Sequence, residues 1–154
     1  MTLFSRNISV DIVEGENGNL VVTSRMVDRL HDITVTLDVS YPDYTIVDAD
    51  VVMTMVPSEH CYLIYPIAKK LIGLRIAKGF NRSVVGILAG VQGCSNVLNL
   101  VLVGAPLAIN AAHLREEALR DTEDALPAAD PCPPSPVYRH EKDHYLKGTC
   151  IAHP

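Results

Sequence analysis

Several patterns typical of common protein classes are missing from this sequence of 154 residues. No apolar run demands a membrane span, because the best candidate, Val97 to Ala112, is short and contains Asn99, Pro106 and Asn110. The N-terminus has no apolar core of the signal-peptide type. We therefore expect a cytoplasmic protein that does not cross a membrane.

The common catalytic and metal-binding motifs are also absent. The segment Gly90-Val91-Gln92-Gly93 lacks the lysine and the spacing of a phosphate-binding loop, and no Gly-x-Ser-x-Gly elbow occurs. The four cysteines, at positions 61, 94, 132 and 150, form no Cys-x-x-Cys pair. A compact zinc knuckle therefore has no support, whereas a site assembled from distant residues stays open. In a reducing compartment we expect no structural disulfide.

Positive charge is scarce, since the formal net charge is −5. Nucleic acid is therefore an unfavourable partner, because phosphates need a basic face. One basic cluster lies in mid-chain, and it is either a solvated helix face or a site for an anionic ligand: Lys69, Lys70, Arg75 and Lys78.

What the sequence does contain is a globular core, since 48% of the residues are hydrophobic. Four segments alternate apolar and polar residues, or are bounded by turn residues, as strands do: 8–12, 20–27, 33–39 and 45–56. Their short connections predict an antiparallel meander with one wet face. In the third segment we expect the apolar residues to face the helices: Ile33, Val35, Leu37 and Val39.

The period changes to that of helices after Pro57. Ser58 is a plausible N-cap, and we expect a short helical turn followed by another helix that begins near Pro66. Residues 80–88 have helical spacing, although 83–88 also suit a short strand. An apolar helix over 97–103 and a second one over 106–119 should be separated by Gly104 and Pro106. We therefore predict an α+β fold: an N-terminal antiparallel four-stranded sheet followed by helices packed on one face.

The composition shifts again near residue 121. Residues 126–136 are proline-rich and predict a linker, so we expect a single domain over 1–121 and a flexible polar tail over 122–154. The tail contains His140-Glu141-Lys142-Asp143-His144, which matches the zinc-protease pattern His-Glu-x-x-His. No apolar periodicity surrounds it, so the context favours coincidence.

The sharpest chemical signal is Cys94, between the turn 90–93 and the apolar helix. At a helix start, unpaired backbone N–H groups and the helix dipole favour a thiolate, so Cys94 is a candidate nucleophile or metal ligand. The alternative is a small hydrophobic residue at a tight turn.

Cys61 resembles Cys94 in its position near the start of a predicted helix, beside His60. If the two helices pack side by side, their sulfurs approach, and two thiolates with a histidine or carboxylate suit zinc or iron. The candidate catalytic residues are Cys94 and Cys61, and the candidate metal ligands are Cys61, Cys94, His60 and Asp50. Asp48, His31 and Asp32 are further candidates.

The order of four segments, HDITVTLDVSYPDYTIVDADVVM, VPSEHC, LIGLRIAKGF and GCSNVLNLV, resembles a bacterial family catalogued only as a domain of unknown function. The resemblance covers about residues 5–103. The central motif of that family looks like Gly-Cys-Thr-His-Leu. Gly93 and Cys94 match it, Ser95 stands for the threonine, and Asn96 stands in place of the histidine.

Two functions remain open from the sequence. The first is an enzyme or enzyme accessory that acts on a small acidic metabolite through a cysteine-centred site, with either a thiolate or a metal such as zinc or iron. The second is a non-catalytic protein-interaction module with structural cysteines. A homo-oligomer is compatible with both.

Overall fold

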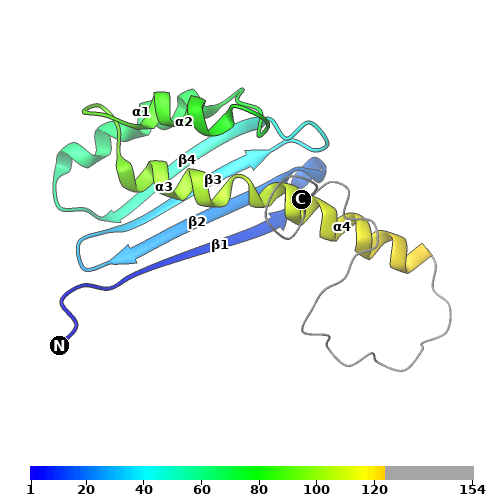
Figure 1. Cartoon of the computed structure of the whole chain (residues 1–154), viewed down its shortest axis with the longest axis horizontal. Helices are drawn as coiled ribbons and strands as arrows, with labels where there is room; N and C mark the ends of the chain where they lie inside the picture. The colour runs from blue at the N-terminus through cyan, green and yellow to red at the C-terminus, as the bar shows by residue number, and fades with distance from the viewer. Residues whose placement is uncertain (124–154) are drawn as a thin grey trace. The chain divides into compact units, whose positions relative to one another are not determined.

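A four-stranded antiparallel sheet forms the N-terminal half of the computed structural model, which describes residues 1–123 (Figure 1). Its strands are β1 (Arg6–Glu14), β2 (Leu20–Asp28), β3 (Asp32–Val39) and β4 (Ile46–Met55). Each strand pairs with the next, in the spatial order β1-β2-β3-β4. A 3-10 turn, η1 (Glu16–Gly18), lies in the first hairpin loop. The predicted meander is confirmed.

One face of this sheet carries the core, because side chains on a strand alternate between the two faces. Ile33, Val35, Leu37 and Val39 are all buried, whereas the residues between them are only half-buried. The same alternation buries Leu20, Val22 and Met26 on β2. The prediction that the apolar residues of β3 face the helices is therefore confirmed.

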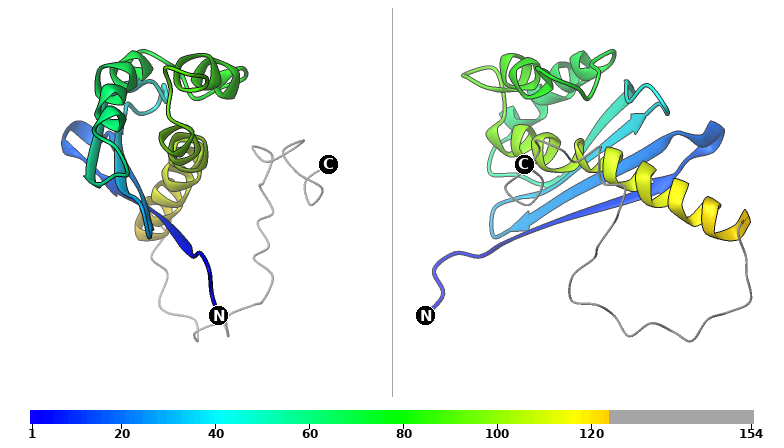
Figure 2. Two further views of the ribbon diagram at one scale, coloured as in Figure 1. Left: turned by 90° about the vertical axis from the view of Figure 1, so that its left-hand side faces the viewer. Right: turned by 45° about the vertical axis from the view of Figure 1, so that its right-hand side comes forward.

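Helices follow the sheet in sequence. A 3-10 turn η2 (Glu59–Leu63) leads into α1 (Ile64–Ala68) and a second turn η3 (Lys69–Leu71). Helix α2 (Phe80–Leu88) comes next, so the alternative of a strand over 83–88 is wrong. Helix α1 and η3 contact β4, while α2 packs against α1 and α3 (Ser95–Gly104) (Figure 2). The predicted α+β class is confirmed.

Helix α3 crosses the buried face over β1, β2 and β3, and α4 (Leu107–Glu123) continues beyond Gly104. The approach to β2 is close, because a Cβ built on Gly104 would lie 2.0 Å from Ser24 Oγ. As expected, the helix is interrupted near Gly104 and Pro106, since α3 ends at Gly104 and α4 begins at Leu107. The stretch Ser95–Leu119 is long and apolar enough to span a membrane by length and composition. One side of it nevertheless packs against the sheet, as in the core helix of a globular domain.

Residues 124–154 lie outside the described residues. The predicted linker, the His140–His144 motif and all but the first two residues of the predicted tail fall within that range. The expected domain division into 1–121 and 122–154 therefore stays a prediction.

Candidate functional site around Cys94

The turn before α3 holds Cys94 in place through the backbone. Cys94 N donates to Leu88 O at 2.9 Å, which brings the chain back to the end of α2. Gly93 permits this approach, because a Cβ there would lie 1.9 Å from Leu88 O. Position 93 therefore requires glycine for the chain to pass this close to α2.

Cys94 is the N-cap residue of α3, with extended φ and ψ angles of −136° and 114°. Its carbonyl accepts from Leu98 N at 2.9 Å, which starts the helix, and its side chain makes no capping hydrogen bond. The sulfur is half-buried and not in a disulfide. A free thiol therefore lies beside the first backbone N–H groups of a ten-residue helix.

Cys61 is positioned by the predicted cap at Ser58. Ser58 Oγ accepts from His60 N at 3.3 Å, and Cys61 N donates to Ser58 O at 3.1 Å. The hydroxyl of Ser58 also lies 3.1 Å from His60 Nδ1, which orients the imidazole. Cys61 is a free, half-buried thiol like Cys94.

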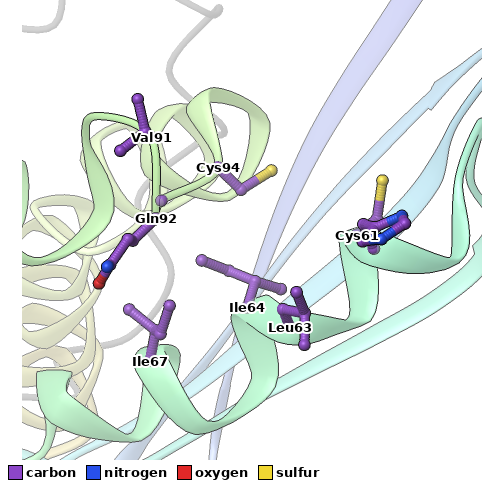
Figure 3. A pocket seen from close by; sticks show the side chains of 9 residues that line it. Cys61, Leu63, Ile64, Ile67, Val91, Gln92 and Cys94 are labelled. Atoms are coloured by element: carbon purple, nitrogen blue, oxygen red, sulfur yellow. The ribbon is translucent and has the colours of Figure 1, made fainter.

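Both cysteines line one pocket of about 600 Å³ (Figure 3). One wall comes from η2 and α1, and the other from the turn that precedes α3. Cys61 and Cys94 are 33 residues apart in sequence, so only the tertiary fold brings them together. The lining combines two sulfurs and an imidazole with apolar and amide groups: His60, Cys61, Leu63, Ile64, Ile67, Val91, Gln92, Gly93 and Cys94.

A second pocket of about 450 Å³ adjoins the first, because Ile67, Val91 and Gln92 line both. Lys70 lines this second pocket, and it is the one lysine or arginine among the residues that line the two pockets. It belongs to the basic cluster identified from the sequence.

Lys69, the neighbouring lysine of the same basic cluster, contacts two aspartates. Lys69 Nζ lies 3.0 Å from Asp48 Oδ1 and 3.9 Å from Asp50 Oδ1. The hydrogen bond from Lys69 lowers the pKa of Asp48 below its usual value. Asp50, on β4, therefore lies near Lys69 of η3 and does not line the cysteine pocket.

The predicted metal ligands are thus only partly brought together. His60, Cys61 and Cys94 share a pocket, and Asp50 does not. Within residues 1–123, no group of three or more histidine, cysteine, aspartate or glutamate residues is arranged to hold a metal ion. The side chains described by the structure do not fit a zinc or iron centre.

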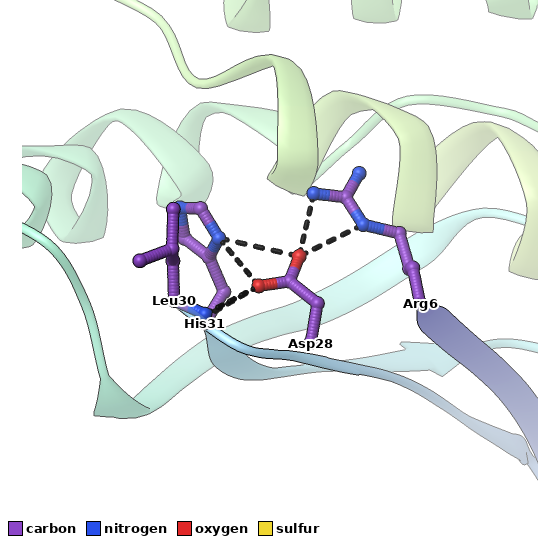
Figure 4. A network of polar contacts seen from close by, with 4 residues as sticks. All are labelled: Arg6, Asp28, Leu30 and His31. Atoms are coloured by element: carbon purple, nitrogen blue, oxygen red, sulfur yellow. Dashed lines mark hydrogen bonds and ion pairs between the residues drawn. The ribbon is translucent and has the colours of Figure 1, made fainter. Parts of the chain in front are cut away.

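His31 and Asp32, two further candidates, have structural partners. Asp32 accepts two hydrogen bonds from Arg25, from Nε at 3.0 Å and from Nη2 at 2.9 Å. His31 Nδ1 lies 3.1 Å from Asp28 Oδ1 (Figure 4).

Asp28 is a buried carboxylate that the sequence analysis missed. It accepts from Arg6 Nη2 at 2.6 Å, and also from the backbone N–H groups of Leu30 and His31. Burial alone would raise its pKa, but these hydrogen bonds outweigh burial and hold the pKa well below its usual range. Knowledge of the β1–β2 register would have found the pair, because Arg6 lies directly opposite Asp28.

A second polar cluster, also missed from the sequence, joins α4 to the sheet at the opposite end of β1. The guanidinium of Arg115 stacks 4.2 Å from the centre of the Tyr41 ring and bonds to Glu14 Oε1 at 3.1 Å. Tyr41 donates its hydroxyl to Glu116, and this hydrogen bond and burial raise the pKa of Tyr41. The residues line a pocket of about 320 Å³ and anchor the helix.

A family model matches residues 4–110, which include the sheet, both cysteines and all of α3. This chain belongs to that family, whose description is protein of unknown function (DUF2889). The resemblance to a domain-of-unknown-function family is confirmed at that level. No curated protein and no solved structure matches the chain.

Proposed function

We propose that the pocket between η2–α1 and the turn 90–94 binds a small acidic metabolite and presents the Cys94 thiol to it as a nucleophile. The observation that carries this proposal is that Cys61 and Cys94, from separate segments, line one pocket as free thiols. In this interpretation the protein is an enzyme or an enzyme accessory.

Cys94 is the better nucleophile of the two cysteines. The start of α3 supplies unpaired N–H groups that can donate to an anion at the sulfur or on a bound acid. Cys61 lies inside η2, a 3-10 turn of five residues that leads into α1, which is also only five residues long, whereas Cys94 caps the ten-residue α3. We assign Cys61 and His60 to the wall that positions the ligand.

Lys70 supplies the charge that an acidic ligand requires. The first pocket has apolar walls from Leu63, Ile64 and Ile67, and Lys70 lines the adjoining pocket. A carboxylate would lie toward Lys70 while the reactive carbon lies toward Cys94. Gln92 lines both pockets and can donate its amide to the ligand between them.

Two alkylating reagents of similar size test this arrangement. Iodoacetate carries a carboxylate and iodoacetamide a neutral amide, and both react when a thiolate displaces iodide from carbon. We expect the iodoacetate-to-iodoacetamide rate ratio at Cys94, measured by peptide mass spectrometry, to exceed that of glutathione in the same buffer. Lys70→Gln should lower the ratio about threefold or more, because about 0.7 kcal/mol is a typical value for one partly exposed charge contact.

Lys78→Gln is the matched control, since it removes one positive charge from the same basic cluster without touching either pocket. The proposal is wrong if Cys94 reacts no faster than an unfolded cysteine, or if both lysine variants change the ratio equally.

The alternative is a protein-interaction module in which the cysteines only fill space. It is favoured if Cys61 and Cys94 are both inert in the native protein. It is also favoured if Cys94→Ser lowers the melting temperature and has no other effect.

Three finer points belong to the same proposal. Catalysis would use the thiolate and not a metal, because the described ligand set does not fit one. A reducing cytoplasm would keep both thiols free. The Gly-Cys-Thr-His-Leu-like motif of the bacterial family would correspond to residues 93–97, with Asn96 at the histidine position.

A further inference from the structure

The outer strand β1 has an unprotected edge. It is nine residues long, and within the described part of the chain it pairs only with β2. Natural proteins usually block such edges with lysine, proline, a bulge or a covering segment. β1 contains neither lysine nor proline, and its register with β2 runs without a shift from Arg6 to Glu14.

The opposite edge of the sheet, along β4, is covered by other segments of the chain. The start of β4 is covered by the chain near Leu74, because Ile46 N donates to Leu74 O at 2.9 Å and Gly73 N donates to Ile46 O at 2.8 Å. Farther along β4, α1 and η3 contact the strand, and Lys69 of η3 lies 3.0 Å from Asp48. Only the β1 edge is therefore long, regular and open in residues 1–123.

The side chains next to this edge are apolar and poorly covered. Ile8, Val10 and Ile12 lie on the core face of the sheet, yet none of them is fully buried, and Ile8 is 39% exposed. Their exposure contrasts with the complete burial of the corresponding residues on β2 and β3.

The neighbouring side of α3 and α4 is also apolar. Arg115 bonds to Glu14 and to Gly18 O, so its side of α4 faces the β1–β2 hairpin. Leu107 and Ala111 precede Arg115 by eight and four residues and therefore lie on the same side of the helix. Leu107 and Val103 are both exposed, at 38% and 42%.

We infer that β1 is the interface with a second copy of this chain, paired antiparallel about a two-fold axis at Val10 to form a continuous eight-stranded sheet. In this register Val10 faces its own copy, Ile8 faces Ile12, and Arg6 faces Glu14. The exposed apolar side of each α3–α4 lies next to the joined strands.

Among the possible registers, the pairing of charged residues favours the one centred on Val10. A shift of one residue would put core-face residues opposite outer-face residues, which the pleat disfavours. Centring on Asp11 would place two aspartates directly opposite each other, and centring on Ser9 would leave Glu14 unpaired and place Arg6 opposite Ile12. Only the axis at Val10 pairs opposite charges at both ends of the ladder.

Arg6 and Glu14 can each form this contact between copies in addition to the contacts that they already make. Arg6 uses Nε and Nη2 for Asp28, and a guanidinium has further N–H donors. The Glu14 side chain is 57% exposed and bonds to Arg115 through one oxygen, Oε1. This inference is independent of the cysteine pocket.

The first test is the mass of the full chain in solution. Sedimentation velocity across a concentration series should show a species of twice the 16.8 kDa chain mass. Glu14→Lys should raise the dissociation constant about fivefold or more, since it opposes Arg6 of the other copy. Glu16→Lys makes the same charge change just outside the strand and should leave the dissociation constant unchanged. A monomer at all concentrations, as expected if residues 124–154 or a different protein occupied the edge, overturns the inference.

The second test reads the register and does not depend on Glu14. Three single substitutions, Ser9→Cys, Val10→Cys and Asp11→Cys, are oxidised in the full chain beside the wild type and run on a non-reducing gel. Directly opposed residues of antiparallel strands have Cα atoms about 4.5–5.5 Å apart, which suits a disulfide. Val10→Cys should give a covalent dimer above the wild-type background. A stronger dimer from position 9 or 11 overturns the proposed axis.

Discussion

At the scale of single residues, the most demanding positions are those where the backbone approaches itself. Gly93 and Cys94 form such a place, because the chain returns to the last turn of α2 and leaves no room for a Cβ at position 93. The geometry of Cys94 therefore depends on its neighbour as much as on its own chemistry.

Gly93→Ala should lower the free energy of unfolding by about 1–3 kcal/mol and slow the alkylation of Cys94, because the turn must open to relieve the clash. Urea unfolding and thiol alkylation measure the two effects. Gly90→Ala is the control, since Gly90 has a φ of +81° but open space around it. It should cost about 1 kcal/mol and leave the reactivity of Cys94 less affected.

Cys94→Ser should abolish the alkylation signal at this site, and any activity that is later assigned, while the unfolding free energy changes by less than about 1 kcal/mol. The hydroxyl is a poor nucleophile and fits the half-buried N-cap, where serine is a preferred residue. Cys132→Ser should change neither property. A Cys94→Ser protein that is destabilised but otherwise fully functional would support the structural role.

The buried carboxylate of Asp28 should make the free energy of unfolding depend on pH. Its pKa in the folded state lies below the unfolded value of about 3.9, so its stabilising contribution is complete above that value and is lost as the pH falls. Asp28→Asn should therefore be less stable than the wild type at pH 7, and the difference should shrink below about pH 5. Urea unfolding at several pH values measures this. Glu16→Gln, at an exposed position outside the strands, is the control and should show no such trend.

At the scale of elements, the position of α3 on the sheet depends on the absence of a side chain at Gly104. The helix lies over β1, β2 and β3, and Ser24 on β2 leaves no room for a Cβ at position 104. Any larger residue would have to lift the helix or move Ser24.

Gly104→Ala should destabilise the protein by about 1–3 kcal/mol in chemical unfolding, because overpacking moves α3 away from β2. Gly86→Ala, in α2 with open space around it, should instead be neutral or stabilising by up to about 1 kcal/mol. Adding Ser24→Ala to Gly104→Ala should recover part of the loss, because the nearest atom, Ser24 Oγ, is then gone. Additive losses would show that the contact with Ser24 is not the cause.

At the scale of the whole molecule, the family match includes everything that forms the cysteine pocket and the β1 edge. The two features lie at different places on the domain, since the pocket is formed by η2, α1 and the turn before α3. A ligand and a second copy of the chain could therefore bind at the same time.

A dimer through β1 predicts that the melting temperature rises with protein concentration, because association stabilises the folded state by mass action. Thermal unfolding followed by circular dichroism at about 5 and 200 μM would show the rise. The Glu14→Lys variant should melt at nearly the same temperature at both concentrations. A concentration-independent wild type would contradict the dimer.

The sequence by itself determined the elements of this protein. Alternation in 33–39 is a local signal, and local backbone geometry converts it directly into a strand. Ser58 and Gly93 were also predictable, because a cap and a tight turn each require particular residue types. The choice between a helix and a strand over 83–88 needed the tertiary contacts of α2.

Only the tertiary structure decided which residues meet. Cys61 and Cys94 line one pocket because the turn before α3 packs beside η2 and α1. Asp50, on β4, instead lies near Lys69 of η3. The pairing of Arg6 with Asp28 and of Arg115 with Glu14 depends on strand register and on the path of α4. Arg6 and Asp28 are 22 positions apart in sequence, and Glu14 and Arg115 are 101 positions apart. A local sequence pattern does not indicate contacts between residues so far apart.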